Sequence, residues 1–328
     1  MNDHVFLSVC LGLAALSGGA CSLDAQGVRA EGAFNRTLGV SGPAELEVQT
    51  GSGDIQIRTG APGVVQVRGR VWCMNVWTGL NANECVRRVE ADPPIEQSGN
   101  VIRLGAIQRH WVWGGVRIGF DVTVPPDAHV RTRSGSGDQI VDNVQGPVEA
   151  RAGSGDIRIE HTNGNVQVST GSGHIGLEGN GGPVLARAAS GSITAGTVKG
   201  DIEVHTSSGR VSVTQTANGR TEVTSSSGNI TVSNARGPLR LRAASGTVAV
   251  DGEPAGTWNV NTASGNVTVR VPANAPFELD AHSNSGRIDS EHPITMMGSL
   301  SRRQLRGQVR GGGPRLEIST SSGAINIR

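Results

Sequence analysis

The sequence lacks the large side chains that fill most protein cores. Among its 328 residues there is no tyrosine, and aromatic residues make up 3% of the chain, although hydrophobic residues as a whole make up 36%. The apolar residues are therefore mostly small or β-branched, which predicts a thin core between short strands. Gly and Pro together make up about 19% of the chain, below the roughly 25–30% that indicates disorder.

An excess of charge of either sign is also missing. The formal net charge is +1 at pH 7, and lysine occurs only at position 199. Domains that bind nucleic acid carry a strongly basic surface. We therefore expect no nucleic-acid partner.

No apolar run reaches the roughly 20 residues that a membrane-spanning helix needs. The run Val5 to Leu16 is shorter, and small residues and Cys21 follow it, which predicts a signal peptide over residues 1–20. A cysteine at the first mature position resembles bacterial lipoproteins, in which this thiol is acylated. We expect lipidation at Cys21 and an outer-membrane location, because Ser22 follows. The alternative is a secreted or periplasmic protein.

An internal repeat indicates the fold class. Ser-Gly and Ser-x-Gly turns recur with glycines at positions 137, 155, 173, 191, 209, 228, 246, 265 and 286, in steps of 18 or 19 residues until the last. Each unit has two similar halves: residues 154–159 read SGDIRI, and residues 163–168 read NGNVQV. The template is a turn glycine, a variable residue, and then an apolar, a polar and an apolar residue.

This template describes short strands with one buried face. Residues two apart lie on the same face of a strand, so Ile157, Ile159, Val166 and Val168 should point inward and Arg158 outward. Strands this short bury their apolar face only when coils stack, about 4.8 Å apart. We predict an all-β protein, a parallel β-solenoid with about 18-residue, two-strand coils, capped at both ends.

Interruptions of the period predict the domain organisation. The expected parts are a flexible tether over 21–35, an N-terminal cap over 36–132, solenoid repeats over 133–290 and a C-terminal cap over 291–328. The C-terminal cap should end in a hairpin-like unit over 315–328. A small helix is expected over 83–91 within an insertion of the N-terminal cap, because Asp92-Pro93-Pro94 would stop it.

The Ser-Gly-Asp-Ile units, the strand ending in Val124-Pro125 and the segment GGGPRLEI at 311–318 resemble the bacterial putative-adhesin domain family of unknown function. That family consists of β-solenoids related to auto-transporter adhesin head domains. The resemblance covers residues 36–328 and implies the fold. It implies a surface role only by analogy, and it supplies no catalytic residues.

A calcium-dependent surface protein is one alternative, since the nine-residue half resembles the calcium-binding β-roll. Asp54, Asp138, Asp156 and Asp201 directly follow turn glycines, but Arg210 occupies the same slot in another coil and would repel the ion. We therefore expect Asx turns at these positions.

A carbohydrate-active β-helix enzyme is the other alternative, with a carboxylate pair assembled across coils. The histidines show no metal-binding spacing, no carboxylate column is visible, and the serines lie in turns. We expect no enzymatic activity, no metal and no cofactor.

An insertion carries most of the remaining unusual residues. Cys73 and Cys85 are expected to form a disulfide in an exported chain, with two buried thiols as the alternative. Four of the five tryptophans lie nearby: Trp72, Trp77, Trp111 and Trp113. They form either a satellite core or a partner-binding surface.

The combined interpretation is an exported, non-catalytic adhesive or structural binding module of the cell envelope. Its partner is expected to be a surface protein or a glycan. It should contact the membrane only through its lipid anchor.

Overall fold

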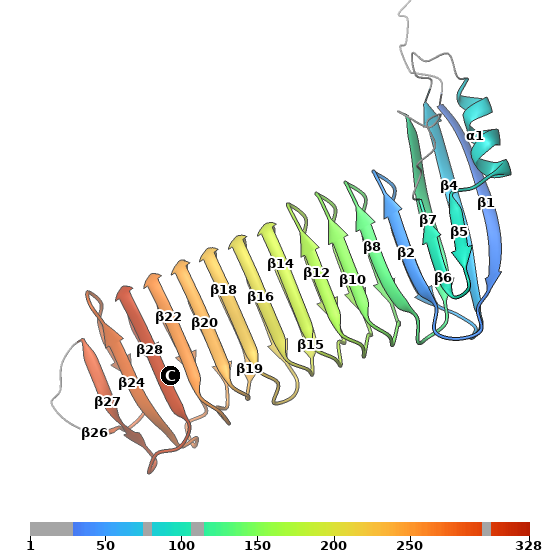
Figure 1. Ribbon diagram of the computed structural model, residues 1–328. Helices are drawn as coiled ribbons and strands as arrows, with labels where there is room; N and C mark the ends of the chain where they lie inside the picture. Colours follow the sequence, from blue (N-terminus) through green and yellow to red (C-terminus); the bar gives the residue numbers. More distant parts are fainter. Residues whose placement is uncertain (1–28, 75–80, 106–114, 297–302) are drawn as a thin grey trace, which may run out of the picture.

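The computed structural model describes residues 29–74, 81–105, 115–296 and 303–328. These residues form a long stack of strands with a helix at its N-terminal end (Figure 1). The described strands make two sheets, of 14 and 15 strands.

Sheet A contains, in spatial order, β1 (Arg29–Gly39), β4 (Val64–Met74), β7 (Val116–Val124), β3 (Ile55–Thr59), β9 (Gln139–Asp142), β11 (Ile157–Glu160), β13 (Ile175–Glu178), β15 (Ile193–Val198), β17 (Val211–Gln215), β19 (Ile230–Ala235), β21 (Val248–Gly252), β23 (Val267–Arg270), β29 (Ile325–Ile327) and β25 (Ile288–Ser290). Sheet B contains β26 (Thr295–Met296), β27 (Gln304–Val309), β24 (Phe277–Ser283), β28 (Arg315–Ser322), β22 (Trp258–Ser264), β20 (Leu239–Ser245), β18 (Thr221–Ser227), β16 (Ile202–Ser208), β14 (Val184–Ser190), β12 (Val166–Thr170), β10 (Val148–Ala152), β8 (His129–Ser134), β2 (Glu45–Thr50), β6 (Val101–Leu104) and β5 (Ile95–Ser98).

Each regular coil consists of one strand of sheet B followed by one strand of sheet A. Neighbouring coils pair in parallel with an offset of 18 residues, so that Val148 lies opposite Val166 and Ile157 opposite Ile175. One 19-residue step keeps the same register, because its extra residue lies in the connection between β17 and β18. The predicted all-β parallel solenoid is confirmed.

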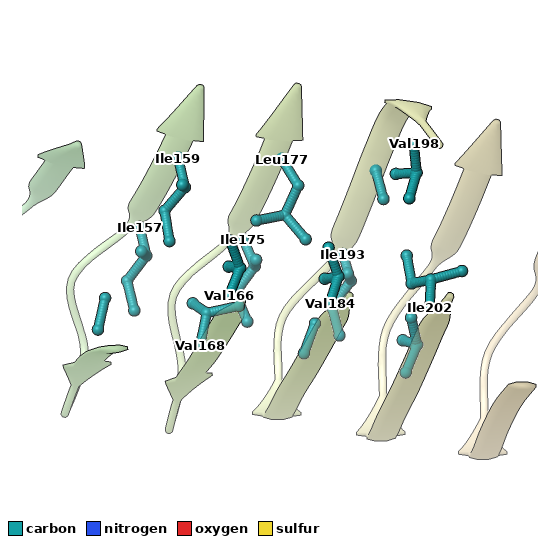
Figure 2. Packing of buried hydrophobic residues seen from close by; sticks show 14 of the residues in the cluster. Ile157, Ile159, Val166, Val168, Ile175, Leu177, Val184, Ile193, Val198 and Ile202 are labelled. Atoms are coloured by element: carbon teal, nitrogen blue, oxygen red, sulfur yellow. The ribbon is translucent and has the colours of Figure 1, made fainter. Parts of the chain in front are cut away.

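The core is a thin apolar layer between the two sheets. Figure 2 shows side chains from successive coils stacked on one another in this layer. Ile157, Ile159, Val166 and Val168 are each at most 1% exposed, whereas Arg158 is exposed. The predicted inward face is therefore confirmed.

Turn glycines are required because the backbones of successive coils approach closely. A Cβ atom on Gly155 would lie 2.1 Å from the carbonyl oxygen of Gly137, and one on Gly173 would lie 2.0 Å from that of Gly155. In later coils the turn glycines also adopt positive φ, as at Gly209 (142°). The glycine of each Ser-x-Gly turn is therefore required both by the turn and by the close approach of the next coil.

The order of coils at the two ends differs from their order in the chain. The coil formed by β28 and β29 lies between the β22–β23 coil and the β24–β25 coil. At the other end, the β2–β3 coil lies between the β6–β7 coil and the β8–β9 coil. The expected terminal hairpin-like unit over 315–328 is therefore wrong, because these residues form a regular parallel coil. The C-terminus lies within the stack (Figure 1).

Antiparallel strands and one helix cover the ends of the stack. β1 and β4 extend sheet A antiparallel to β7, β5 pairs antiparallel with β6, and β26 and β27 extend sheet B beyond β24. Part of the expected tether over 21–35 is wrong, since its residues from Arg29 onward pair with β4. The other expected domain boundaries stay predictions.

Helix α1 (Ala82–Ala91) confirms the helix expected over 83–91. The side chain of Asn81 accepts a hydrogen bond from the backbone N–H of Asn83 and caps its first turn. At the other end of α1, the Glu90 carboxylate accepts the backbone N–H of Ala33 in β1, at 2.9 Å. The helix thereby satisfies part of the open edge of sheet A. In the part of the chain that the structure describes, no helix is long and apolar enough to cross a membrane.

Candidate functional site

The outer face of sheet B carries a basic column, which we call the arginine column. Parallel pairing brings one outward residue per coil into line: Gln49, Arg133, Arg151, Ser169, Arg187, His205, Thr224, Arg242 and Asn261. All four arginines are exposed, and no member of the column is acidic. The register of the coils thus converts arginines scattered along the sequence into a line of positive charge.

A second column of mixed charge runs beside the first, two residues earlier in each strand. Near the N-terminal end, Arg131 donates hydrogen bonds to Glu47 (2.6 Å) and Glu149 (3.1 Å), and Arg103 donates to Glu47 at 3.1 Å. The hydrogen bonds from Arg131 and Arg103 lower the pKa of Glu47, and those to Glu47 and Glu149 raise the pKa of Arg131. Glu47 is therefore held ionised, and both carboxylates are paired with guanidinium groups.

A shallow hollow of about 300 Å³ lies over this ion-pair network. Its lining includes His129, Arg131, Glu149, Asn165 and Gln167. Such a mixture of charges and amides can bind polar groups by hydrogen bonds. The hollow is an extension of the open face of sheet B.

The outer face of sheet A carries the opposite charge at the same level of the stack. Asp142, Glu160 and Glu178 are in register on β9, β11 and β13. The expectation that the sequence contains no carboxylate column is therefore wrong. Their 18-residue spacing in the sequence could have revealed it.

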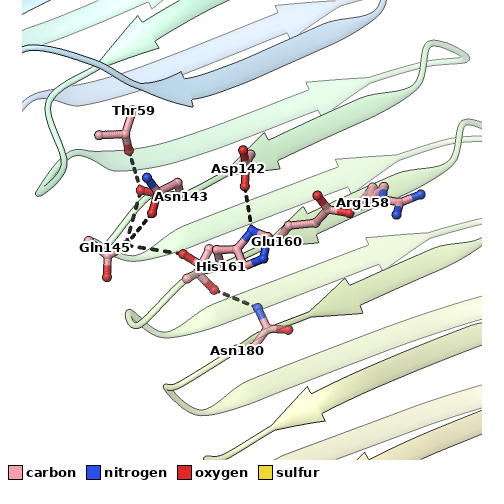
Figure 3. Close-up of polar contacts among 9 residues, drawn as sticks. Thr59, Asp142, Asn143, Gln145, Arg158, Glu160, His161 and Asn180 are labelled. Carbon is pink, nitrogen blue, oxygen red and sulfur yellow. Dashed lines mark hydrogen bonds and ion pairs between the residues drawn. The ribbon is translucent and has the colours of Figure 1, made fainter.

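Two members of this acidic column are paired with neighbouring basic side chains (Figure 3). Arg158 pairs with Glu160, and the Nδ1 atom of His161 lies 3.0 Å from Asp142 Oδ1. The hydrogen bond to Asp142 raises the pKa of His161, and the charges of Asp142, Glu160 and Glu178 act in the same direction. Asp142, Glu160 and His161 place three possible metal ligands within 4.8 Å of one another, but Asp142 already bonds His161 and Glu160 already pairs with Arg158.

The acids that follow the turn glycines link neighbouring coils. Asp138 Oδ1 accepts the backbone N–H of Asp156 at 2.9 Å, and Asp156 Oδ1 accepts that of His174 at 2.7 Å. Asn229 does the same for Thr247 at 3.0 Å. The expectation of Asx turns is wrong at these positions. Each side chain accepts a hydrogen bond from a backbone N–H of the next coil, and not from its own turn. Stacking thus explains the residues that suggested a calcium-binding repeat.

In the insertion, Cys73 on β4 and Cys85 on α1 are joined by a disulfide, with their Cα atoms 6.2 Å apart. Trp72 is half-buried, and the guanidinium groups of Arg70 and Arg117 lie 5.8 and 5.5 Å from its ring centroid. Three other expected tryptophans, Trp77, Trp111 and Trp113, lie outside the described residues, as does the expected lipidation site, Cys21. A tryptophan surface therefore stays a prediction.

One protein-family model matches the chain. The family model described as Toastrack DUF4097 matches residues 165–328. No curated protein sequence matches the chain.

Three solved structures resemble the chain at low identity. A "putative adhesin" from Bacteroides fragilis NCTC 9343 is 13% identical, with a TM-score of 0.37, and the match covers 90% of this chain and 97% of that one. A "putative lipid binding protein" from Parabacteroides distasonis ATCC 8503 is 12% identical, with a TM-score of 0.43 and coverages of 90% and 96%. A "putative cell adhesion protein" from Clostridium sporogenes ATCC 15579 is 10% identical, with a TM-score of 0.20 and coverages of 91% and 99%.

Proposed function

The chain belongs to the Toastrack DUF4097 family, and we propose that it is an exported, non-catalytic binding module of the cell envelope. In this proposal the solenoid presents the outer face of sheet B to a ligand, and the N-terminal end holds the rod at the envelope. Adhesion to a surface glycan or protein is the activity that such a module would provide.

The observation that carries the proposal is the continuous outer face of sheet B. Its strands from β2 to β22 are all parallel and in register, so that their outward side chains form straight polar columns. Coil-to-coil hydrogen bonds and the buried core hold these side chains at fixed spacing. A preorganised surface binds an extended ligand with little loss of its own conformational entropy.

The environment of Glu47 supports binding rather than glycoside hydrolysis. A glycosidase needs a carboxylic acid whose pKa is raised, so that it can donate a proton. On the outer face of sheet B the pKa of Glu47 is shifted downward instead, because Arg131 and Arg103 hydrogen-bond to its carboxylate. A carboxylate held ionised by two guanidinium groups is suited to an ion-pair network.

The position of β1 supports attachment through the N-terminal end. β1 begins at Arg29 and lies in the cap at one end of the stack (Figure 1). Acylation at Cys21 would therefore tether the rod by this end and leave the outer face of sheet B accessible. Cell fractionation tests this part: the wild-type chain should be recovered with the outer membrane, and Cys21→Ala should release it or stop its maturation. A wild-type chain found entirely in the soluble periplasm or medium would contradict anchoring.

A combined binding and turnover assay tests the module itself. The chain from residue 22 onward is immobilised and offered a panel of neutral and acidic surface polysaccharides and envelope proteins. We expect at least one ligand to be retained without release of new reducing ends. Depolymerisation of a retained glycan would contradict the non-catalytic function and favour an enzyme.

A further inference from the structure

We infer that the arginine column of sheet B binds a linear acidic polysaccharide that lies along the axis of the rod. This inference rests on the proposed binding function and names the surface and the ligand class. It follows from three features of the column: free positive charge, regular spacing and an unobstructed flank.

Most of the positive charge of the arginine column is free. Among the described residues, Arg133, Arg187 and Arg242 have no carboxylate partner, and only Arg151 has one, Glu149 at 2.8 Å. An exposed guanidinium has donors in a planar fork that matches a carboxylate in a bidentate geometry. These groups are therefore available to an anionic ligand.

The spacing of the column suits a polymer with repeated charges. Neighbouring coils are about 4.8 Å apart, which is close to the length of one sugar unit in an extended chain. Arg133 and Arg151 are on adjacent coils, Arg187 is two coils further, and Arg242 is three coils beyond Arg187. A uronic-acid chain parallel to the rod could thus bring a carboxylate to each arginine in turn.

Small residues line one flank of the column. The outward positions two residues after the column members are Gly135, Gly153, Gly171, Ala189, Ser207 and Ser226. No long side chain rises from this strip, so a polysaccharide can lie against the backbone beside the arginines. The acidic residues of sheet B are on the opposite flank: Arg131 pairs with Glu47 and Glu149 near the N-terminal end, and Glu203 and Glu222 lie further along, where Glu203 pairs with His205 of the column.

The same features argue against two other occupants. A single-stranded nucleic acid is usually held by stacking of its bases on large aromatic side chains, and neither the column nor its small-residue flank contains Phe, Tyr or Trp. A second copy of this chain would offer the acidic column of sheet A, but Arg158 and His161 already pair with Glu160 and Asp142.

Binding to polygalacturonate tests the inference. The chain from residue 22 onward contains every described residue, and it is compared with the triple variant Arg133→Gln, Arg151→Gln, Arg187→Gln. The control is Arg210→Gln, Arg220→Gln, Arg236→Gln, which removes the same charge from exposed turn positions outside the column. Equal melting temperatures of the three proteins establish that they are equally folded.

We expect the column variant to bind polygalacturonate about tenfold or more weakly, as the loss of three exposed ion pairs implies, and the control to change about twofold or less. Methyl-esterified polygalacturonate, which has the same backbone without the charge, should not bind. Added salt should weaken binding to the acidic form.

Four results would overturn the inference: no binding of polygalacturonate, an equal loss in the control, equal binding of the esterified polymer, or tighter binding of poly(dT). Self-association that the column variant abolishes, measured by sedimentation, would reassign the column to a second copy of the chain. If polygalacturonate fails but the panel assay still retains another ligand without turnover, this inference fails and the proposed function stands.

Discussion

The structural role of a residue in a coil follows from its position in the repeat. The inward positions are filled by Ile, Val, Leu and Ala, which fit between two sheets that approach closely. The residue after the turn glycine, as at Asp138 and Asp156, bonds the next coil through its side chain. The largest exception is Trp258, which is 1% exposed and donates its indole N–H to the carbonyl oxygen of Gly237 at 3.1 Å.

Replacement of an inward residue should be far more damaging than replacement of its outward neighbour. Ile159→Asp places a charge in the apolar layer and should lower the free energy of unfolding by more than about 3 kcal/mol. Arg158→Gln removes only an exposed ion pair with Glu160, which contributes little to the free energy of unfolding. Urea denaturation of both variants measures the difference. Equal losses would show that the face assignment is wrong.

His161 should titrate above its ordinary pKa of 6.5, because the carboxylate of Asp142 stabilises its protonated form. A raised pKa in the folded state means that this contribution to stability is complete below the unfolded pKa and is lost as pH rises through the folded one. NMR titration of the histidine ring should show the His161 pKa falling in Asp142→Asn. An unaltered His161 pKa in the variant would contradict the pairing.

Individual strands and the helix are stabilised by different means along the rod. The strands from β8 to β23 repeat one parallel arrangement, in which each strand has a neighbour on both sides. At the ends of the sheets, β1, β4, β5, β26 and β27 pair antiparallel, which places tight connections and a covering helix where more of the sheet edge would otherwise be exposed. The disulfide joins two such end elements, β4 and α1.

Removal of the disulfide should loosen α1 and leave the coils intact. The bond closes a loop with a sequence separation of 12, and the chain-entropy model values such closure at roughly 3 kcal/mol. In the Cys73→Ser, Cys85→Ser variant, hydrogen exchange of α1 should accelerate strongly. Amides of β14 to β20 should exchange as in the unmodified chain. Unchanged protection of α1 would show that its packing on β1 and β4 suffices.

The molecule as a whole is a quasi-one-dimensional stack in which each coil contacts mainly its two neighbours. At both ends, the order of the coils in space differs from their order in the chain. The β6–β7 coil lies outside the β2–β3 coil, and the β24–β25 coil lies outside the β28–β29 coil. As a result, β28, close to the C-terminus, is paired on both sides with β22 and β24. The last segment of the chain is therefore bound into the sheet.

Hydrogen exchange should reveal this insertion of the C-terminal strand. Amides of β28 are expected to be protected about as well as those of β20, because both are central strands, whereas those of β26 should exchange early at the edge of sheet B. Mass spectrometry of peptic fragments can compare the three strands directly. Early exchange of β28 would indicate a frayed chain end and contradict the observed order of coils.

The local features of this protein were readable from its sequence. The period of 18 residues, the alternation at Ile157, Arg158 and Ile159, and the stop at Asp92-Pro93-Pro94 each depend on a few neighbouring residues. Backbone geometry and burial therefore predicted the solenoid, its inward face and helix α1 before any long-range contact was known.

The order of coils at the ends, and the course of the charged columns across the longer steps, were decided only by the tertiary structure. Every coil offers nearly the same edge, so no local signal makes β28 prefer the place between β22 and β24. Likewise, the 18-residue period already suggests that Arg133, Arg151 and Arg187 align, but the continuation of their column to Arg242 depends on the register across the 19-residue step. Stacking of whole coils sets that register, and stacking is a property of the assembled fold, because a single strand pairs equally well with many neighbours.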